Sequence, residues 1–230
     1  MIGSLFSGIG GLELGLERAG LGPTIWQVEI DPKARAILAR HWPSTLLLED
    51  VREVCPTGLT KPDLICGGFP CQDISSANYN RRGLSGEKSG LWVHFHRIVE
   101  ALQPSWVVVE NVASGWKKWV SVVRSDLHGI GYSSMPIRVC AADVGARHRR
   151  CRVFIVANLD SDGKLQPERC VENIWRWASN CRWWADEPDV ARVVHGLSGR
   201  LDRERFLGNA VVPQVAEAVG HGILACLGGN

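Results

Sequence analysis

The alternation of short β-branched runs with helical patterns constrains the fold more than any other feature of the sequence. The runs that predict strands are Ile2–Phe6, Thr24–Ile30, Thr45–Leu48, Asp63–Cys66, Trp106–Val109 and Arg152–Ala157. Between the first two lies a helical pattern that Gly20 ends, and Asp31-Pro32 is typical of a helix start. Trp106–Val109 is apolar throughout, as a central parallel strand is. This alternation predicts an α/β fold on a mostly parallel sheet.

Two stretches interrupt the alternation. Gln72–Gly90 is polar and rich in Ser, Asn, Gly and Arg, which predicts a long mobile loop. Asn158–Gly199 has no regular pattern and predicts a small subregion of its own, whereas Val215–Leu227 is amphipathic and helical. We therefore expect one main domain, 1–157 plus 206–230, and a subregion at 158–205.

The composition favours a cytoplasmic protein with one sizeable core. The chain has 230 residues, of which 45% are hydrophobic, and none of its apolar runs is long enough to span a bilayer. Its first residues, Met1–Phe6, lack the basic start and the cleavage site of a signal peptide. The eight cysteines form no Cys-x-x-Cys pair, so we expect neither a zinc site nor a disulfide framework.

Local clusters of arginine are more informative than the net charge of +2. Four arginines lie within 147–152, and a second set is spread over 169–205. Among the second set lie four of the ten tryptophans, Trp175, Trp177, Trp183 and Trp184. Such a mixture can stack against and hold a nucleic acid, or it can form an ordinary small core, and both readings stay open.

A glycine-rich turn, Ser7–Gly11, follows the first predicted strand and precedes a helix. Glycines let the backbone approach a ligand, and the helix start offers free N–H groups. Glu29 ends the second strand, where a carboxylate can bind a ribose diol, and Asp50 ends the third, within reach of an adenine ring. Ligands of open α/β sheets bind at these strand ends, and both NAD and S-adenosylmethionine fit the pattern so far.

Three further motifs bring reactive side chains to the same edge. Cys71 follows the fourth strand at the start of the polar loop, where a thiolate can meet a substrate, whereas Cys66 lies within the strand. Glu110 follows the apolar fifth strand and places a carboxyl group there. His148–Arg152 precedes the last strand and supplies cationic donors.

In chain order, these motifs resemble those of the cytosine-C5 DNA methyltransferase family. They are Phe6–Gly10, Glu29, Asp50, Gly68–Gln72, Glu110–Val112, Arg150–Phe154 and Gly208–Val211. The resemblance covers residues 1–157 and about 200–230, and Pro-Cys-Gln with Glu-Asn-Val is its most specific part. It implies a Rossmann-like fold that uses S-adenosylmethionine, with a small irregular subregion. The main domain would then be catalytic and bind the cofactor, and 158–205 would be a reduced target-recognition subregion.

The resemblance also assigns roles to single residues. Cys71 would be the nucleophile, Glu110 the proton donor, and Arg150 and Arg152 the groups that hold the base oxygen. The cofactor residues would be Phe6, Gly8, Gly10, Glu29, Ile30, Asp50, Val51, Asn209 and Val211. The residues on the DNA side would be Pro70, Gln72, Arg81 and Arg82. The expected substrate is a cytosine flipped out of double-stranded DNA.

The sequence departs from the family in two ways. His148 stands where the family usually has Gln, and the interval 158–205 is short for a target-recognition region. We expect a monomer, with a cognate restriction endonuclease as a possible partner and no membrane association. A non-catalytic DNA- or cofactor-binding homologue and an RNA cytosine-C5 methyltransferase stay open as alternatives, although the Cys-Phe-Thr signature of the tRNA-methylating branch is absent. A dehydrogenase fits worst, because Glu13 stands where the Gly-x-Gly-x-x-Gly pattern of dinucleotide-binding turns has its third glycine.

Overall fold

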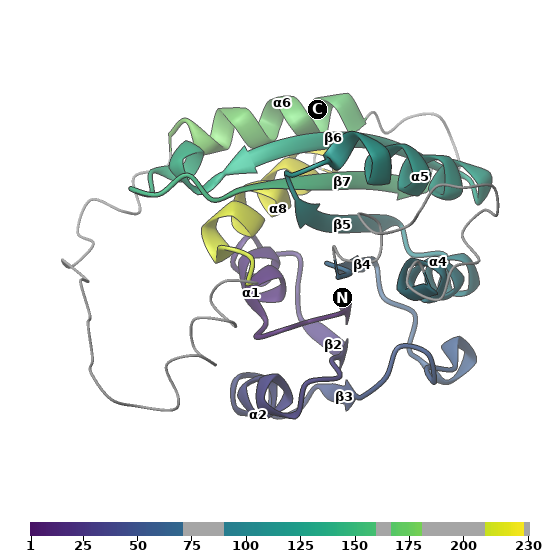
Figure 1. Ribbon diagram of the computed structural model, residues 1–230. Coiled ribbons are helices and arrows are strands. Elements are labelled where there is room, and N and C mark those ends of the chain that lie inside the picture. The colour runs from purple at the N-terminus through teal and green to yellow at the C-terminus, as the bar shows by residue number, and fades with distance from the viewer. Residues whose placement is uncertain (71–89, 160–166, 181–209, 228–230) are drawn as a thin grey trace.

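The computed structural model describes residues 1–70, 90–159, 167–180 and 210–227 (Figure 1). Its first half contains β1 (Ile2–Leu5), α1 (Gly11–Arg18), β2 (Thr24–Val28), α2 (Pro32–His41), β3 (Leu46–Leu48), η1 (Pro56–Gly58) and β4 (Leu64–Gly67). The second half contains α4 (Gly90–Leu102), β5 (Trp106–Val112), α5 (Trp116–Gly129), β6 (Tyr132–Cys140), η2 (Ala141–Val144), β7 (Cys151–Leu159), α6 (Pro167–Ala178) and α8 (Pro213–Leu227). The predicted α/β class is confirmed.

The strands form a seven-stranded sheet in the order β3-β2-β1-β4-β5-β7-β6. Strands β1 to β5 pair in parallel, and β7 runs antiparallel to both of its neighbours. The order of the first five strands is that of dinucleotide-binding folds. The insertion of β7 between β5 and β6 departs from that order, so the sheet differs from that of a dehydrogenase.

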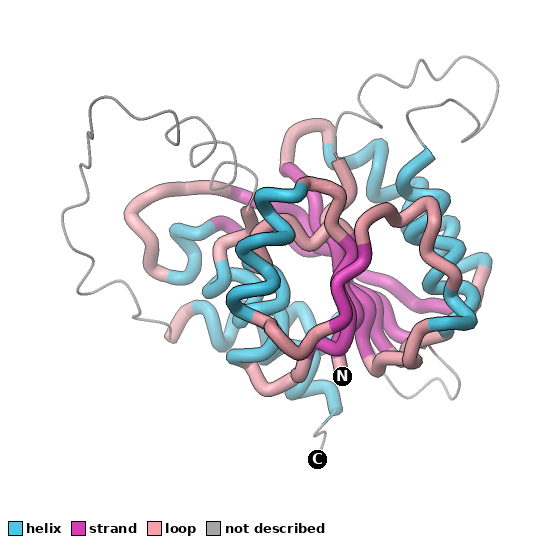
Figure 2. The backbone as a smooth tube through the Cα atoms, turned by 90° about the horizontal axis from the view of Figure 1, so that it is seen from below, coloured by secondary structure: helices cyan, strands magenta, loops and turns pink. Residues whose placement is uncertain are grey.

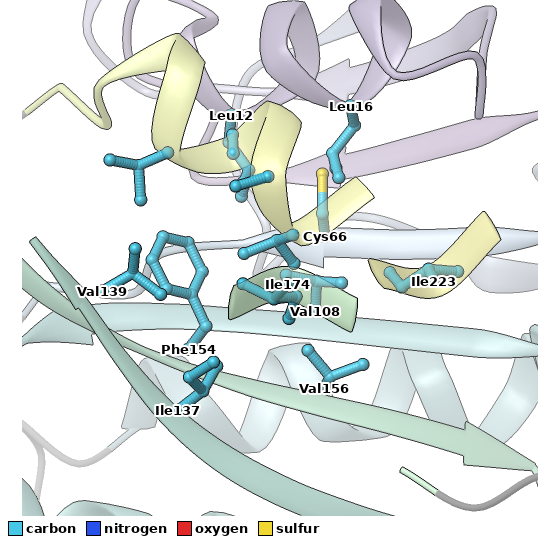
Figure 3. Close-up of a cluster of buried hydrophobic side chains, with 14 of the residues drawn as sticks. Leu12, Leu16, Cys66, Val108, Ile137, Val139, Phe154, Val156, Ile174 and Ile223 are labelled. Atoms are coloured by element: carbon cyan, nitrogen blue, oxygen red, sulfur yellow. The ribbon is translucent and has the colours of Figure 1, made fainter. Parts of the chain in front are cut away.

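Helices cover both faces of the sheet (Figure 2). On one face, α1, α6 and α8 pack against the strands, and α8 lies beside α1 and α6 (Figure 1). Figure 3 shows Leu12 and Leu16 of α1 facing strand residues that include Cys66, Val108 and Phe154. On the other face, the aromatic and aliphatic residues of α4 and α5 form a second core over β1, β4, β5 and β7.

Three differences from the sequence-based prediction concern β5, β6 and α6. The fifth strand extends to Val112, so Glu110 lies within it instead of after it. The edge strand β6 was not predicted, because its serines and Pro136 weaken the strand pattern; a proline is tolerated there because only one side of an edge strand is paired. Helix α6 lies in the stretch for which no regular structure was predicted.

Helix α6 is the part of the expected target-recognition subregion that the structure describes. Its residues Cys170, Ile174 and Ala178 are buried in the same core as α1 and α8. This helix therefore rests on the main domain. Residues 181–205 lie outside the described residues, and the division into a main domain and a subregion stays a prediction.

The predicted helix start at Asp31-Pro32 is confirmed, since the Asp31 carboxylate accepts hydrogen bonds from the backbone N–H groups of Lys33 and Ala34. The expectation of no disulfide is wrong for one pair: Cys140 and Cys151 face each other in the β6–β7 ladder and are bonded. Among the described helices, none has the length and apolar character that crossing a membrane requires. No group of three or more potential metal ligands was found within the described ranges.

Candidate active site

The strand register brings the predicted site residues to one edge of the sheet. Leu5 pairs with Val28 and Gly67, Val28 pairs with Leu48, and Gly67 pairs with Val109. The parallel strands therefore end side by side. The residues that come next along the chain are Phe6, Glu29, Glu49, Gly68 and Glu110, of which Glu110 still belongs to β5. The prediction that the motifs share one edge is confirmed for the described residues.

Glu29 organises the glycine-rich turn. Its Oε2 accepts a hydrogen bond from the Gly8 backbone N–H at 2.7 Å, and its Oε1 accepts one from the Asp31 N–H at 2.8 Å. Phe6 and Gly8 both have a φ of 56°, a conformation that glycine adopts without a steric penalty. A carboxylate can accept about four hydrogen bonds, so Glu29 keeps capacity for a ligand hydroxyl pair.

The neighbouring strand ends combine an exposed apolar side chain with a fixed carboxylate. Ile30 is 58% exposed, although it lies only two residues after the end of β2. Asp50 accepts hydrogen bonds from the Arg52 backbone N–H and guanidinium, and these hold the pKa of its carboxyl below the usual value. Val51 is buried beside them. An apolar surface next to a charged acceptor suits an adenine ring with its amino group, so these residues fit S-adenosylmethionine.

Glu110 is a buried carboxyl group near the end of β5. Its side chain is 8% exposed, and Arg152 Nε lies 2.9 Å from its Oε1. Burial raises the pKa of Glu110 to about 7, while the charges of Arg152 and Arg150 oppose that rise. A carboxyl group with this pKa exists in both protonation states at neutral pH, so it can donate a proton and take it back.

The turn before Cys71 is built against Glu110. A β-carbon at Gly68 would lie 2.6 Å from Glu110 Oε2, so any other residue there would displace this carboxylate. Asn111 Nδ2 donates a hydrogen bond to the Phe69 carbonyl at 3.0 Å, and Asn111 Oδ1 accepts one from the Val112 N–H. Asn111 was not among the predicted site residues, although it belongs to the Glu-Asn-Val motif that carried the resemblance. It anchors the chain two residues before Cys71.

The two arginines of the Arg-Cys-Arg motif have different partners. Arg152 pairs with Glu110, a contact that was not predicted, and its predicted role at the base oxygen stays a prediction. Arg150 Nη2 instead donates a hydrogen bond to the Ala210 carbonyl at 2.5 Å. Val211 lies at the start of α1, where its carbonyl oxygen would overlap a β-carbon at Gly11. Arg150 thus binds the C-terminal segment next to Val211, a residue that the resemblance had assigned to the cofactor.

Several predicted residues cannot be placed in this geometry. Pro70 is exposed and is the last described residue before the gap. The predicted residues outside the described ranges are Cys71, Gln72, Arg81, Arg82 and Asn209.

Among the arginines and tryptophans of 169–205, Trp177 is half-buried and stacks on His221 with ring centroids 4.7 Å apart, which fits the interpretation as a small core. Trp175 is 40% exposed, and Arg176 is exposed beside it.

The fold and this edge define a class: an α/β domain with a glycine-rich turn at the carboxyl ends of its parallel strands and a buried carboxyl–arginine pair at the same edge. The chain belongs to the C-5 cytosine-specific DNA methylase family, which matches residues 1–177. The predicted family and the Rossmann-like methyltransferase fold are thereby confirmed.

Named relatives and solved structures agree with this assignment. The chain is 37% identical over 169 residues to the type II methyltransferase M2.BsuMI of Bacillus subtilis (strain 168), covering 70% of this chain and 42% of the relative. It is 31% identical to M.AquIA of Picosynechococcus, covering 67% and 70%. A crystal structure of a putative DNA modification methyltransferase encoded within an E. coli prophage matches with a TM-score of 0.58 and 33% identity, covering 72% and 48%. Dnmt2 methyltransferase from S. pombe, with a TM-score of 0.65 and 17% identity, shares the fold.

The chain spans less than half the length of two of the relatives it matches, 42% of M2.BsuMI and 42% of the type II methyltransferase M.NgoFVII of Neisseria gonorrhoeae, to which it is 35% identical over 66% of its own length.

Proposed function

We propose that this protein is a DNA (cytosine-5-)-methyltransferase. The observation that carries the proposal is the Glu110–Arg152 pair, buried beside the turn that leads to Cys71. This pair lies at the same sheet edge as the glycine turn and Glu29. Family membership supports the same activity.

The chemistry requires that carbon 5 of cytosine be made nucleophilic. Cys71 would add as a thiolate to carbon 6, which turns the ring into an enamine with electron density at carbon 5. Glu110 would donate a proton to N3 as the thiolate adds, and its pKa of about 7 suits that exchange. Arg152, held 2.9 Å from Glu110, would bind the base oxygen and stabilise the adduct. Afterwards the carbon 5 proton leaves to a base or water, Cys71 departs as a thiolate, and the N3 proton returns to Glu110.

S-adenosylmethionine, when bound, would supply the electrophilic methyl group. Glu29 would accept hydrogen bonds from the ribose hydroxyls. No atom lies within 4 Å of the position that a β-carbon at Gly8 would take, so the ligand can approach the backbone there. Ile30 would cover the adenine, and Asp50 would accept its amino group. Phe6, Gly10, Val51, Asn209 and Val211 complete the proposed set.

The DNA side of the proposal rests on Pro70 and on residues outside the described ranges, Gln72, Arg81 and Arg82. The target carbon is unreachable inside a duplex, so the base must be flipped into the site. Since relatives such as M2.BsuMI are named type II methyltransferases, a cognate restriction endonuclease is the proposed functional partner. We further propose that the protein acts as a cytoplasmic monomer.

A methyl-transfer assay with labelled S-adenosylmethionine tests this function. Mixed-sequence duplex DNA should become labelled at cytosine carbon 5, while tRNA offered at the same concentration should not. Labelling of tRNA alone would replace the proposal by an RNA methyltransferase. Cofactor binding without transfer to either nucleic acid would make the protein a non-catalytic homologue.

A further inference from the structure

Arg150 and Arg152 are separated only by Cys151, but their guanidinium groups have different direct partners. Arg152 lies beside Glu110, whereas Arg150 Nη2 is hydrogen-bonded to the Ala210 carbonyl. The backbone of Arg150 also has a φ of 23°, a value that residues other than glycine rarely adopt. Such conformations persist where the surrounding structure holds them and are frequent at functional sites.

The segment that Arg150 holds is packed against the start of α1. The Val211 carbonyl lies so close to Gly11 that a β-carbon there would overlap it. Gly11 is the last residue of the glycine-rich turn Ser7–Gly11 and the first of α1. On the other side, the Val212 carbonyl accepts hydrogen bonds that begin α8, which packs along α1. Ala210 and Val211 therefore lie between the Arg150 guanidinium and the start of α1, next to the glycine-rich turn of the proposed cofactor site.

We propose that Arg150 is a positioning residue that holds Ala210 and Val211 against the start of α1, and so shapes the cofactor end of the site. In this arrangement Arg152 pairs directly with Glu110 and would bind the base oxygen, while Arg150 acts on Glu110 through its charge. This inference rests on the proposed function, because it takes S-adenosylmethionine as the ligand that the segment closes over. It differs from the role that the resemblance assigned to Arg150, which was to bind the base oxygen.

Binding of S-adenosylmethionine to the full chain without DNA tests this inference, measured by isothermal titration calorimetry. Arg150→Met keeps the length of the side chain but removes its donors, and the dissociation constant should rise about tenfold or more, since a hydrogen bond from a charged group contributes about 1.5–3 kcal/mol. Arg150→Lys keeps the charge and one donor and should recover part of the loss. The control is Arg149→Met, an exposed neighbour with the same change of charge, for which the constant should change less than about twofold.

A double-mutant cycle tests whether the effect passes through Val211. Gly11→Ala pushes on Val211 from the opposite side and should also weaken cofactor binding. If both changes act on one segment, their combination should cost less than the sum of the two single effects. This arm keeps the test decisive if Arg150→Met unfolds, because Arg150→Lys can replace it in the cycle.

The possible results separate the two claims. Equal cofactor binding by the wild type and Arg150→Met, with slower reaction at the base, would overturn the positioning role and leave the proposed function standing. Additive effects of Gly11→Ala and the Arg150 variant would also overturn it. A wild-type protein that does not bind S-adenosylmethionine would overturn the proposed function and this inference with it.

Discussion

At Glu110, burial and two guanidinium groups act on one carboxyl in opposite directions. Burial dominates and raises its pKa to about 7, while Arg152 and Arg150 limit the rise. Because this pKa exceeds the usual 4.5, the folded protein holds a proton that the unfolded chain releases. Glu110 therefore contributes stability below about pH 4.5, and this contribution is lost as the pH rises through about 7.

Replacing Glu110 by Gln should remove the transferable proton and keep the shape. Turnover should fall by roughly 10²–10⁴, the usual contribution of general acid–base catalysis, while the dissociation constant for S-adenosylmethionine changes little. In the wild type, kcat/KM for DNA should decline above about pH 7, and in Glu110→Gln this decline should be absent. Steady-state kinetics over pH 5.5–9 would check this. Loss of cofactor binding with turnover intact would remove Glu110 from the chemistry.

Gly68 offers a test of geometry at the same carboxyl. In Gly68→Ala the added β-carbon would lie 2.6 Å from Glu110 Oε2, so the carboxyl must move. A misplacement on the order of 1 Å can cost about 10²-fold in rate, and kcat should fall accordingly. Gly58→Ala is the matched control, because its β-carbon would meet nothing within 4 Å. Similar kcat values for the two variants would show that Glu110 does not need this position.

At the scale of elements, the close approach of α1 and α8 depends on small residues. A β-carbon at Gly15 would overlap the Pro213 carbonyl and crowd Ala216. Gly15→Ala should therefore lower the free energy of unfolding by about 1–3 kcal/mol, as overpacking does. Gly129→Ala, at the end of α5 with no atom near its β-carbon, should change it by less than about 1 kcal/mol. Urea denaturation would compare them, and a Gly15→Ala protein as stable as wild type would contradict this packing.

Elements with a strong period were predictable, and those held by their neighbours were not. The buried run at Trp106–Val109 indicated β5. That the strand continues through Glu110 could not be predicted, because a charged residue after an apolar run usually indicates the end of a strand. There the ladder with β7 pairs Glu110 with Phe154 and extends the strand. In β6, Ser133, Ser134 and Pro136 give no strand pattern, and pairing with β7 decides the conformation.

The site was predictable to the extent that its residues follow strands. Parallel strands end at one edge, so Glu29 and Glu110 could be placed together from the sequence. The partner of Arg150 could not, because Ala210 is 60 residues away and contributes only its backbone carbonyl. Asn111 likewise acts on a backbone carbonyl, that of Phe69, and such contacts leave no pattern in side-chain types.

At the scale of the whole molecule, the short interval 158–205 would limit how the proposed methyltransferase reads DNA, if it is the target-recognition subregion. Each good bidentate base contact discriminates by only about 1–3 kcal/mol, and so small a region presents few of them. We expect a target of roughly two to four base pairs, with the exposed Arg176 among the candidate readers. Bisulfite sequencing of a genome exposed to the protein would reveal the motif. A shared motif of six or more base pairs would place specificity elsewhere in the chain or in a partner.

The central claim is a covalent adduct between Cys71 and the target base, beside Glu110 and Arg152. Fluorine at carbon 5 cannot leave as a proton does, so the reaction should stop at the adduct. Duplex DNA that carries 5-fluorocytosine at target sites should, with S-adenosylmethionine, form a complex that survives denaturing electrophoresis. Mass spectrometry should place the linkage on Cys71. Cys71→Ser should form no such complex, whereas Cys55→Ser, at an exposed cysteine away from the site, should form it at the wild-type level. A stable adduct with Cys71→Ser, or near-normal methyl transfer by that variant, would contradict the account.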